Sequence, residues 1–226
     1  RYEVISSLDA PTVYPEYDLL IADRRIDMVA IFGQIVHGEL KPDDNGWWAF
    51  HNTTWTYESL GFEKVEDLPD GLGHRLELVD QGLTFSITMY NPTGFADAVA
   101  GPPTEPGAEA RSSHAALSKA RFRAAMKANE LVYYNGHAFY GSLKVLDEKG
   151  AYPEDTYQVV FMDACWSYAY YTKQVFRNKA TEADPEGWAL VDVVNNTEPG
   201  VTGSEATATL MWQILFAGAL AAHSGR

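Results

Sequence analysis

The second half of the chain alternates short apolar runs with amphipathic segments, and few folds accommodate this alternation. The apolar runs are LVYYNG (131–136), YQVVFM (157–162) and WALVDVVNN (188–196). Nearly continuous apolar runs of this length are typical of strands that are buried on both faces of a parallel sheet. Helix-like segments alternate with them, and the last such segment begins near Ser204. We therefore expect an α/β fold with a mainly parallel sheet covered by helices on both faces.

The segment SSHAALSKARFRAAMKANE (112–130) is predicted to form the helix that leads into the first apolar run. Ser112 or Ser113 is the expected N-cap, because a serine side chain accepts a hydrogen bond from the free amides at a helix N-terminus. The apolar spacing directs four side chains of this helix toward the core. They are Leu117, Ala120, Ala124 and Met126.

The first half of the chain has a different pattern. Residues 1–25 are mixed and proline-containing, which is typical of a lead-in arm, and the segment 25–40 begins with a strand-like run. The aromatic and Thr-rich segment 47–62 (WWAFHNTTWTYESLGF) is predicted to be β-structure. Alternating residues on either side of DQG predict a hairpin over 75–89. The Pro- and Gly-rich segment 91–110 is predicted to be a loop.

These patterns divide the chain into a β-rich N-terminal region, 1–110, and an α/β region, 111–226. The two regions form either two subdomains or one continuous domain with a β-rich elaboration. We favour one unit whose doubly wound part begins before residue 112, since a chain of 226 residues can bury one large core. No internal repeats are present in the sequence.

The charge balance argues against two classes of partner. The formal net charge is −14, from 31 acidic and 17 basic residues. An acidic surface repels phosphate backbones and anionic lipid, so we expect neither nucleic acid nor a membrane surface as a partner. A cationic substrate or a basic peptide would be attracted instead. The segment 206–222 is apolar, but it is short for a bilayer span and contains Gln213, and we interpret it as a buried helix rather than an anchor.

The number and spacing of cysteines and histidines argue against a fold that is stabilised by disulfides or by a bound metal. The single cysteine, Cys165, excludes an internal disulfide and a cysteine-built zinc site. The other histidines are scattered without a ligand-like spacing, so no metal site is expected. We expect a soluble protein. The sequence indicates neither its cellular compartment nor its oligomeric state. Because Arg1 stands where a start Met would be, one interpretation is a secreted or periplasmic protein whose targeting segment is absent from this chain.

A histidine and the lone cysteine follow two of the apolar runs. His137 comes after LVYYNG, and Cys165 comes after YQVVFMDA. Functional side chains gather at the carboxyl ends of parallel strands, and an imidazole beside a thiol can activate it as a nucleophile. Gly136 permits a tight turn before the histidine, and backbone amides at Gly136, near Ala138 and at Cys165 are candidate oxyanion donors. The helix expected after Cys165 would favour the thiolate through its N-terminal dipole.

The segments LVYYNGHAFYG and YQVVFMDACWS together resemble the caspase-like cysteine peptidases, which include metacaspases, gingipains, clostripain and legumain. That family places a His-Gly after one apolar strand and a Cys after the next. The stretch DACWS is similar to the Asp-x-Cys-x-Ser of metacaspases, so Asp163 and Ser167 also match. The glycine that follows the histidine in the family is Ala138 here. The resemblance covers about residues 112–222.

The resemblance implies a caspase-like α/β/α sandwich and a cysteine endopeptidase that needs no cofactor. Cys165 would be the nucleophile that forms a thioester with the substrate, and His137 the general acid and base. Asp163 would line a pocket for Arg or Lys on the amino side of the cleaved bond of a protein or peptide substrate. Three residues after the third apolar run would contact substrate: Asn195, Asn196 and Thr197. Some members need calcium for activation, but the acidic residues near Asn45 are too few to indicate such a site.

Several alternatives stay open at this point. A lone cysteine after a strand is often a buried small apolar residue, and a single histidine is often structural. Asp163 could cap the following helix instead of lining a pocket. The aromatic segment 47–62 could present a carbohydrate platform or be buried. A catalytically inactive caspase-like protein that acts as a binding or regulatory module is the main rival to the peptidase, because of Ala138 and the bulky Trp166 beside the cysteine.

Overall fold

Seven strands form one mixed sheet in the order β2-β3-β4-β1-β5-β6-β7. The computed structural model describes residues 15–36, 40–94, 108–141, 143–200 and 205–225. The strands are β1 (Arg25–Phe32), β2 (Glu63–Asp67), β3 (Gly73–Asp80), β4 (Leu83–Tyr90), β5 (Leu131–Asn135), β6 (Gln158–Asp163) and β7 (Val191–Asn195). The helices are α1 (Tyr17–Leu20), α2 (Asn45–Ser59), α3 (Ala108–Ala128), α4 (Ser167–Lys179) and α5 (Glu205–His223).

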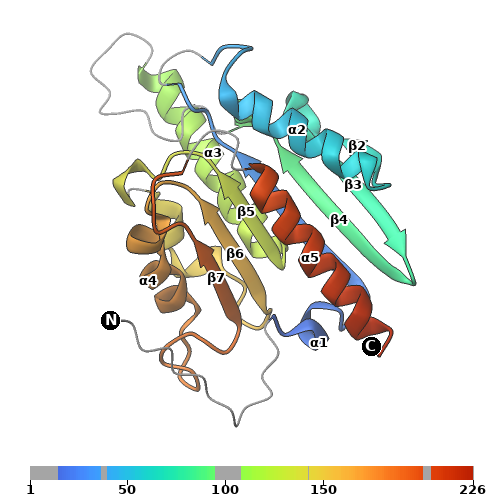
Figure 1. The fold of residues 1–226 in the computed structure, drawn as a ribbon. Coiled ribbons are helices and arrows are strands. Elements are labelled where there is room, and N and C mark those ends of the chain that lie inside the picture. Colours follow the sequence, from blue (N-terminus) through green and yellow to red (C-terminus); the bar gives the residue numbers. More distant parts are fainter. Residues whose placement is uncertain (1–14, 37–39, 95–107, 142, 201–204, 226) are drawn as a thin grey trace.

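Five adjacent strands, β4, β1, β5, β6 and β7, run parallel, and β3 and β2 extend the sheet in antiparallel fashion. Helices α1, α2 and α5 cover one face, and α3 and α4 cover the other (Figure 1). The side chains of β6 are buried along its whole length, as expected of a strand between two helical layers. The predicted α/β fold with a mostly parallel sheet flanked by helices is confirmed.

Strand β1 lies in the middle of the sheet, between β4 and β5. From β1 the chain crosses through α2 to the edge strand β2 and returns through β3 to β4, which pairs with β1. After α3 it forms β5 on the other side of β1 (Figure 1). The carboxyl ends of β1 and β5 therefore flank a topological switch point, where open α/β sheets commonly bind ligands. Strands from the regions 1–110 and 111–226 thus belong to one sheet.

The prediction of β-structure over 47–62 is wrong, because this segment forms most of α2. Its β-branched and aromatic residues favour strands locally, but Ala49, Phe50 and Tyr57 recur at helical spacing and are buried against the sheet. Asp44 caps the helix by accepting the amide of Gly46 at 2.8 Å. Trp48 and Trp55 of the same helix are exposed, so this aromatic segment is buried only on one side.

The helix before β5 is present, but its start and its buried face differ from the prediction. Helix α3 begins at Ala108, so Ser112 and Ser113 lie within it and are not its N-cap. Of the predicted core residues only Met126 is buried, whereas three are exposed. Those three are Leu117, Ala120 and Ala124. The buried face instead includes Ser118, Phe122 and Ala125. Because the helix is rich in alanine, its apolar spacing did not define a single face.

Most of the remaining secondary-structure predictions are confirmed. The hairpin of β3 and β4 turns at Gln81 and Gly82, and β5, β6, β7 and α4 occupy the predicted segments. The arm at 1–14 and most of the loop at 91–110 lie outside the described residues. Helix α5 is long and apolar enough to cross a membrane, but the core helices of soluble proteins can have the same length and composition. One face of α5 packs on the sheet through Trp212 and Leu215.

Glu130, between α3 and β5, predicts how stability depends on pH. Its Oε2 accepts the amide of Asp27 at 2.8 Å. Burial, and then the nearby charges of Asp23 and Asp27, raise the pKa of Glu130 from 4.5 to about 7. The unfolded chain therefore loses this proton at lower pH than the folded chain, so the free energy of unfolding falls as the pH rises from about 4.5 to 7.

Glu130→Gln removes this titration and retains an acceptor for the Asp27 amide. We expect the variant to lose less stability over this interval and to be more stable than the wild type above it. Urea unfolding midpoints measured across the pH range test this, with Glu58→Gln on the exposed side of α2 as the control. Identical pH profiles for wild type and Glu130→Gln would contradict the assignment.

Candidate functional site

His137 and Cys165 each lie two residues beyond the carboxyl end of one of two adjacent parallel strands. Strand β5 pairs with β6 so that Asn135 is opposite Asp163. The register continues past the strands, because the amide of Gly136 donates to the carbonyl of Asp163 at 3.3 Å. His137 follows Asn135 by two residues, and Cys165 follows Asp163 by two. The two apolar runs that precede these residues therefore form neighbouring strands.

The ring of His137 is hydrogen-bonded across the switch point. Its Nε2 lies 2.6 Å from the carbonyl oxygen of Ile35, in the loop that follows β1. A carbonyl only accepts hydrogen bonds, so Nε2 carries a proton. In the neutral ring Nδ1 is then the acceptor, and it can take a proton from a nucleophile. The loop after β1 therefore selects the tautomer of His137.

Two facing glycines allow the turn that carries His137. The Tyr134 hydroxyl donates to the carbonyl of His137 at 3.0 Å. A Cβ on Gly136 would lie 2.6 Å from that hydroxyl oxygen, and a Cβ on Gly33 would lie 3.1 Å from it. The absence of both side chains makes room for the folded-back tyrosine. The glycine that precedes the histidine is thus required by a close approach.

Cys165 is partly exposed and lies in a sharp turn between β6 and α4. The next residue, Trp166, has a left-handed backbone with φ 49° and ψ 30°, a conformation that costs a non-glycine residue about 1 kcal/mol or more. Helix α4 begins at Ser167, so the cysteine precedes a helix N-terminus as predicted. The thiol Sγ lies 3.7 Å from the carbonyl oxygen of Gly200, in the segment after β7.

The segment after β7 holds the start of α4 through the backbone. The amide of Trp166 donates to Glu198 at 3.1 Å, and the amide of Tyr168 donates to Asn196 at 3.0 Å. The buried hydroxyl of Ser167 accepts the amide of Asn196 at 2.8 Å. Ser167 therefore ties the cysteine turn to the end of β7, which gives this residue a structural role.

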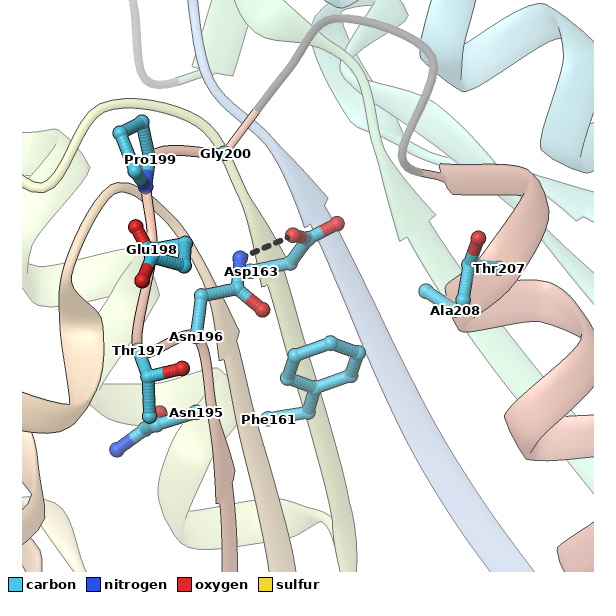
Figure 2. A pocket seen from close by; sticks show the side chains of 10 residues that line it. All are labelled: Phe161, Asp163, Asn195, Asn196, Thr197, Glu198, Pro199, Gly200, Thr207 and Ala208. Atoms are coloured by element: carbon cyan, nitrogen blue, oxygen red, sulfur yellow. Dashed lines mark hydrogen bonds between the residues drawn. The ribbon is translucent and has the colours of Figure 1, made fainter.

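Asp163 is buried and is the centre of a hydrogen-bond network. Its carboxylate accepts from Tyr133 Oη at 3.0 Å and from the side-chain amide of Asn135 at 2.9 Å. It also accepts from the side-chain amide of Asn196 at 2.8 Å, the bond drawn in Figure 2. Burial, followed by the charge of Asp163, raises the pKa of Tyr133 well above its ordinary value, so the hydroxyl stays protonated and donates. These three donors are neutral, and they orient the carboxylate. Asp163 does not cap α4, whose N-cap residue is Trp166.

A cavity of about 370 Å³ opens beside this network, between the ends of β6 and β7 and the first turn of α5 (Figure 2). Its lining includes Phe161, Asp163, residues 195–200 and Thr207. Two of the lining side chains, Asp163 and Glu198, are carboxylates. Gly200 both lines the cavity and accepts from the thiol, so Cys165 is adjacent to the cavity wall. The arrangement suits a cationic group near a nucleophile.

The predicted substrate-contacting residues all line this cavity, but they differ in availability. Asn195 donates to Thr172 at 2.9 Å and accepts the amide of Met162 at 3.3 Å, so its side chain joins β7 to α4 and β6. Asn196 is engaged with Asp163. Thr197 is exposed. Of the three, Thr197 is the best placed to contact a ligand.

The candidate oxyanion donors are unequal. The amide of Gly136 is used within the sheet, since it donates to Asp163. Ala138 is buried, and its carbonyl accepts from Tyr171. Among the described residues neither the amide of Ala138 nor that of Cys165 donates a hydrogen bond, so both stay candidates. The part of the chain that the structure describes contains no group of three or more His, Cys, Asp or Glu placed to hold a metal ion.

Sequence reasoning missed the residues that position the pair. Ile35, Asn135 and Gly200 contribute through backbone atoms or through a network whose members come from different strands. Such contacts leave no local motif. Asp44 did carry a signal, because an Asp before a helical apolar spacing is a typical N-cap.

Comparisons with protein-family models, with curated proteins and with solved structures found no match to this chain.

Gly136→Ala tests the packing beneath His137. The new Cβ would overlap the hydroxyl and Cζ of Tyr134, at 2.6 Å and 2.8 Å. We expect a loss of about 1–3 kcal/mol in the free energy of unfolding, typical of overpacking. Urea denaturation measures it. Gly150→Ala is the matched control, because its Cβ would have no neighbour within 4 Å. Equal stability of the two variants would show that the turn has room to adjust.

Proposed function

We propose that the protein is a cysteine endopeptidase with a caspase-like α/β/α sandwich, in which Cys165 is the nucleophile and His137 the general acid and base. The observation that carries the proposal is that the two residues each follow, by two positions, one of two adjacent parallel strands whose last residues are paired. The order of histidine and cysteine along the chain, each after an apolar strand, supports it through the resemblance described above.

The chemistry follows from the tautomer of His137. When a peptide docks, the thiol turns from Gly200 toward Nδ1 of His137, which accepts its proton while the sulfur attacks the peptide carbonyl. Side-chain rotation of this kind is common, since catalytic hydrogen bonds often form only in the substrate complex. The amide of Cys165 stabilises the oxyanion. The imidazolium then protonates the leaving amine, and water activated by the neutral ring hydrolyses the thioester.

The acidic cavity supports a preference for Arg or Lys at the residue whose carbonyl is attacked. Asp163 is two residues before Cys165, and both face the region around Gly200. The donors around Asp163 fix its carboxylate before the substrate arrives, so little reorganisation is needed. The net charge of −14 attracts basic peptides at long range.

A catalytically inactive binding module of the same fold is the second candidate. The thiol hydrogen bond runs toward the β7 side, and the histidine bond runs toward the β1 side. Trp166, a bulky side chain that is 45% exposed, stands directly after the cysteine. In these contacts the thiol of Cys165 and the ring of His137 bind to opposite sides of the site and not to each other. A binding protein has no need to bring them together.

Alkylation of the only thiol separates the two candidates. A peptidase predicts rapid iodoacetamide labelling of Cys165 at neutral pH, and protection by a peptidyl-arginine chloromethyl ketone. His137→Ala is expected to slow labelling and to lower the rate of peptide hydrolysis about 100-fold or more, since the proton acceptor is lost. His223→Ala, at the end of α5, is the matched control and should behave like the wild type.

Cleavage of a peptide library completes this test. The wild type should hydrolyse peptides, and a folded Cys165→Ala variant should hydrolyse none. A slow thiol that ignores the chloromethyl ketone, together with no cleavage by the wild type, would favour the binding module.

Asp163→Asn tests the pocket. We expect kcat/KM for substrates with Arg before the cleaved bond to fall about 10- to 100-fold, because a charge-assisted hydrogen bond contributes about 1.5–3 kcal/mol. For the wild type, replacing that Arg with uncharged citrulline should cause a similar loss. Asp192→Asn is the control, because Asp192 also accepts from a tyrosine but sits on β7 opposite Val159, away from the site. An unchanged Arg preference in folded Asp163→Asn would refute the pocket assignment.

A further inference from the structure

We propose that Asp44 is a positioning residue for His137, acting through the peptide unit that joins Ile35 and Val36. This inference rests on the proposed function, because it assigns a partner to the proposed catalytic histidine. Asp44 is buried and is the N-cap of α2, on the far side of the loop that follows β1.

The carboxylate of Asp44 binds three backbone amides. Oδ1 accepts from Gly46 at 2.8 Å and from Ile35 at 3.0 Å. Oδ2 accepts from Val36 at 2.7 Å and lies 3.2 Å from the Ile35 amide. One of these bonds caps the helix. The others hold the loop after β1, so the side chain has a second role that capping alone does not require.

The bond to Val36 acts on the same peptide unit that His137 contacts. The amide of Val36 and the carbonyl of Ile35 are the two polar ends of one planar group. Asp44 binds the amide end at 2.7 Å, and Nε2 of His137 binds the carbonyl end at 2.6 Å. Because the group is planar, fixing one end fixes the direction of the other. A carboxylate at the amide end also polarises the peptide and makes the carbonyl a better acceptor.

The loop itself is anchored to the sheet and to α2. The amide of Gly33 donates to Asn135 on β5 at 2.8 Å. A Cβ on Gly46 would lie 2.2 Å from the carbonyl oxygen of Gly33, so the helix start is in close contact with the strand end. The Asp44 carboxylate adds its bonds to the amides of Ile35 and Val36 and so restrains the peptide between them.

Asp44→Ser separates the two roles of the side chain. Serine retains the cap to Gly46 but is too short to reach the loop amides as well, so the fold should be retained while the peptide is released. NMR of ¹⁵N-histidine-labelled protein reports the tautomer of His137, assigned by the loss of its signal in His137→Asn. We expect the wild type to hold the Nε2–H tautomer and Asp44→Ser to give a mixture of both.

For Asp44→Ser we expect kcat to fall about 10- to 100-fold with KM within about twofold, since loss of the carboxylate misplaces the base and Asp44 does not touch substrate. Asp184→Ser is the matched control, because Asp184 also accepts a loop amide, that of Ala189 at 2.8 Å, but lies in the loop before β7. It should change neither readout.

A wild-type tautomer and wild-type kcat in folded Asp44→Ser would overturn the inference. The tautomer measurement does not depend on catalysis. If the wild type hydrolyses no peptide, the proposed function fails. In that case a tautomer that shifts in Asp44→Ser still supports the positioning role, and an unchanged tautomer refutes it.

Discussion

The site depends on the in-register parallel pairing of β5 with β6. These two strands are buried by helices on both faces, and hydrogen bonds fix Asn135 opposite Asp163. A shift of one residue would turn the side chains of one strand to the opposite face and disrupt their packing against both helical layers. The register of the two strands also sets where the residues that follow them begin. This register brings the chain segments that carry His137 and Cys165 to the same edge of the sheet.

Backbone groups, rather than side chains, hold His137 and Cys165 on the two sides of the β5–β6 strand pair. On the β1 side a carbonyl selects the tautomer of His137. On the β7 side the segment 196–198 binds the start of α4 and thereby holds the cysteine turn. Side chains act one step further out: Asp44 restrains the loop after β1, and Ser167 anchors the end of β7. The strained backbone of Trp166 persists because the segments around it are tied down on both sides.

Asp163 joins the interior of the sheet to its open edge. The same carboxylate that receives Tyr133 from the core also faces the cavity. A buried charge is retained only where its hydrogen-bonding capacity is well used, and here three neutral donors surround it. The network therefore keeps a negative charge in place beside Cys165, which is the electrostatic basis for proposing a cationic substrate group.

The sequence by itself determined the fold class, the central strands and the two residues that follow them, because burial on both faces imposes apolar runs that can be recognised locally. It misassigned α2, since β-branched and aromatic residues favour strands until the sheet offers a helix a face to cover, and it misplaced the buried face of the alanine-rich α3. Only the tertiary structure decided what surrounds His137 and Cys165. Those partners are backbone atoms and side chains from β1, β5, β7 and α2, and contacts between distant segments leave no pattern along the chain.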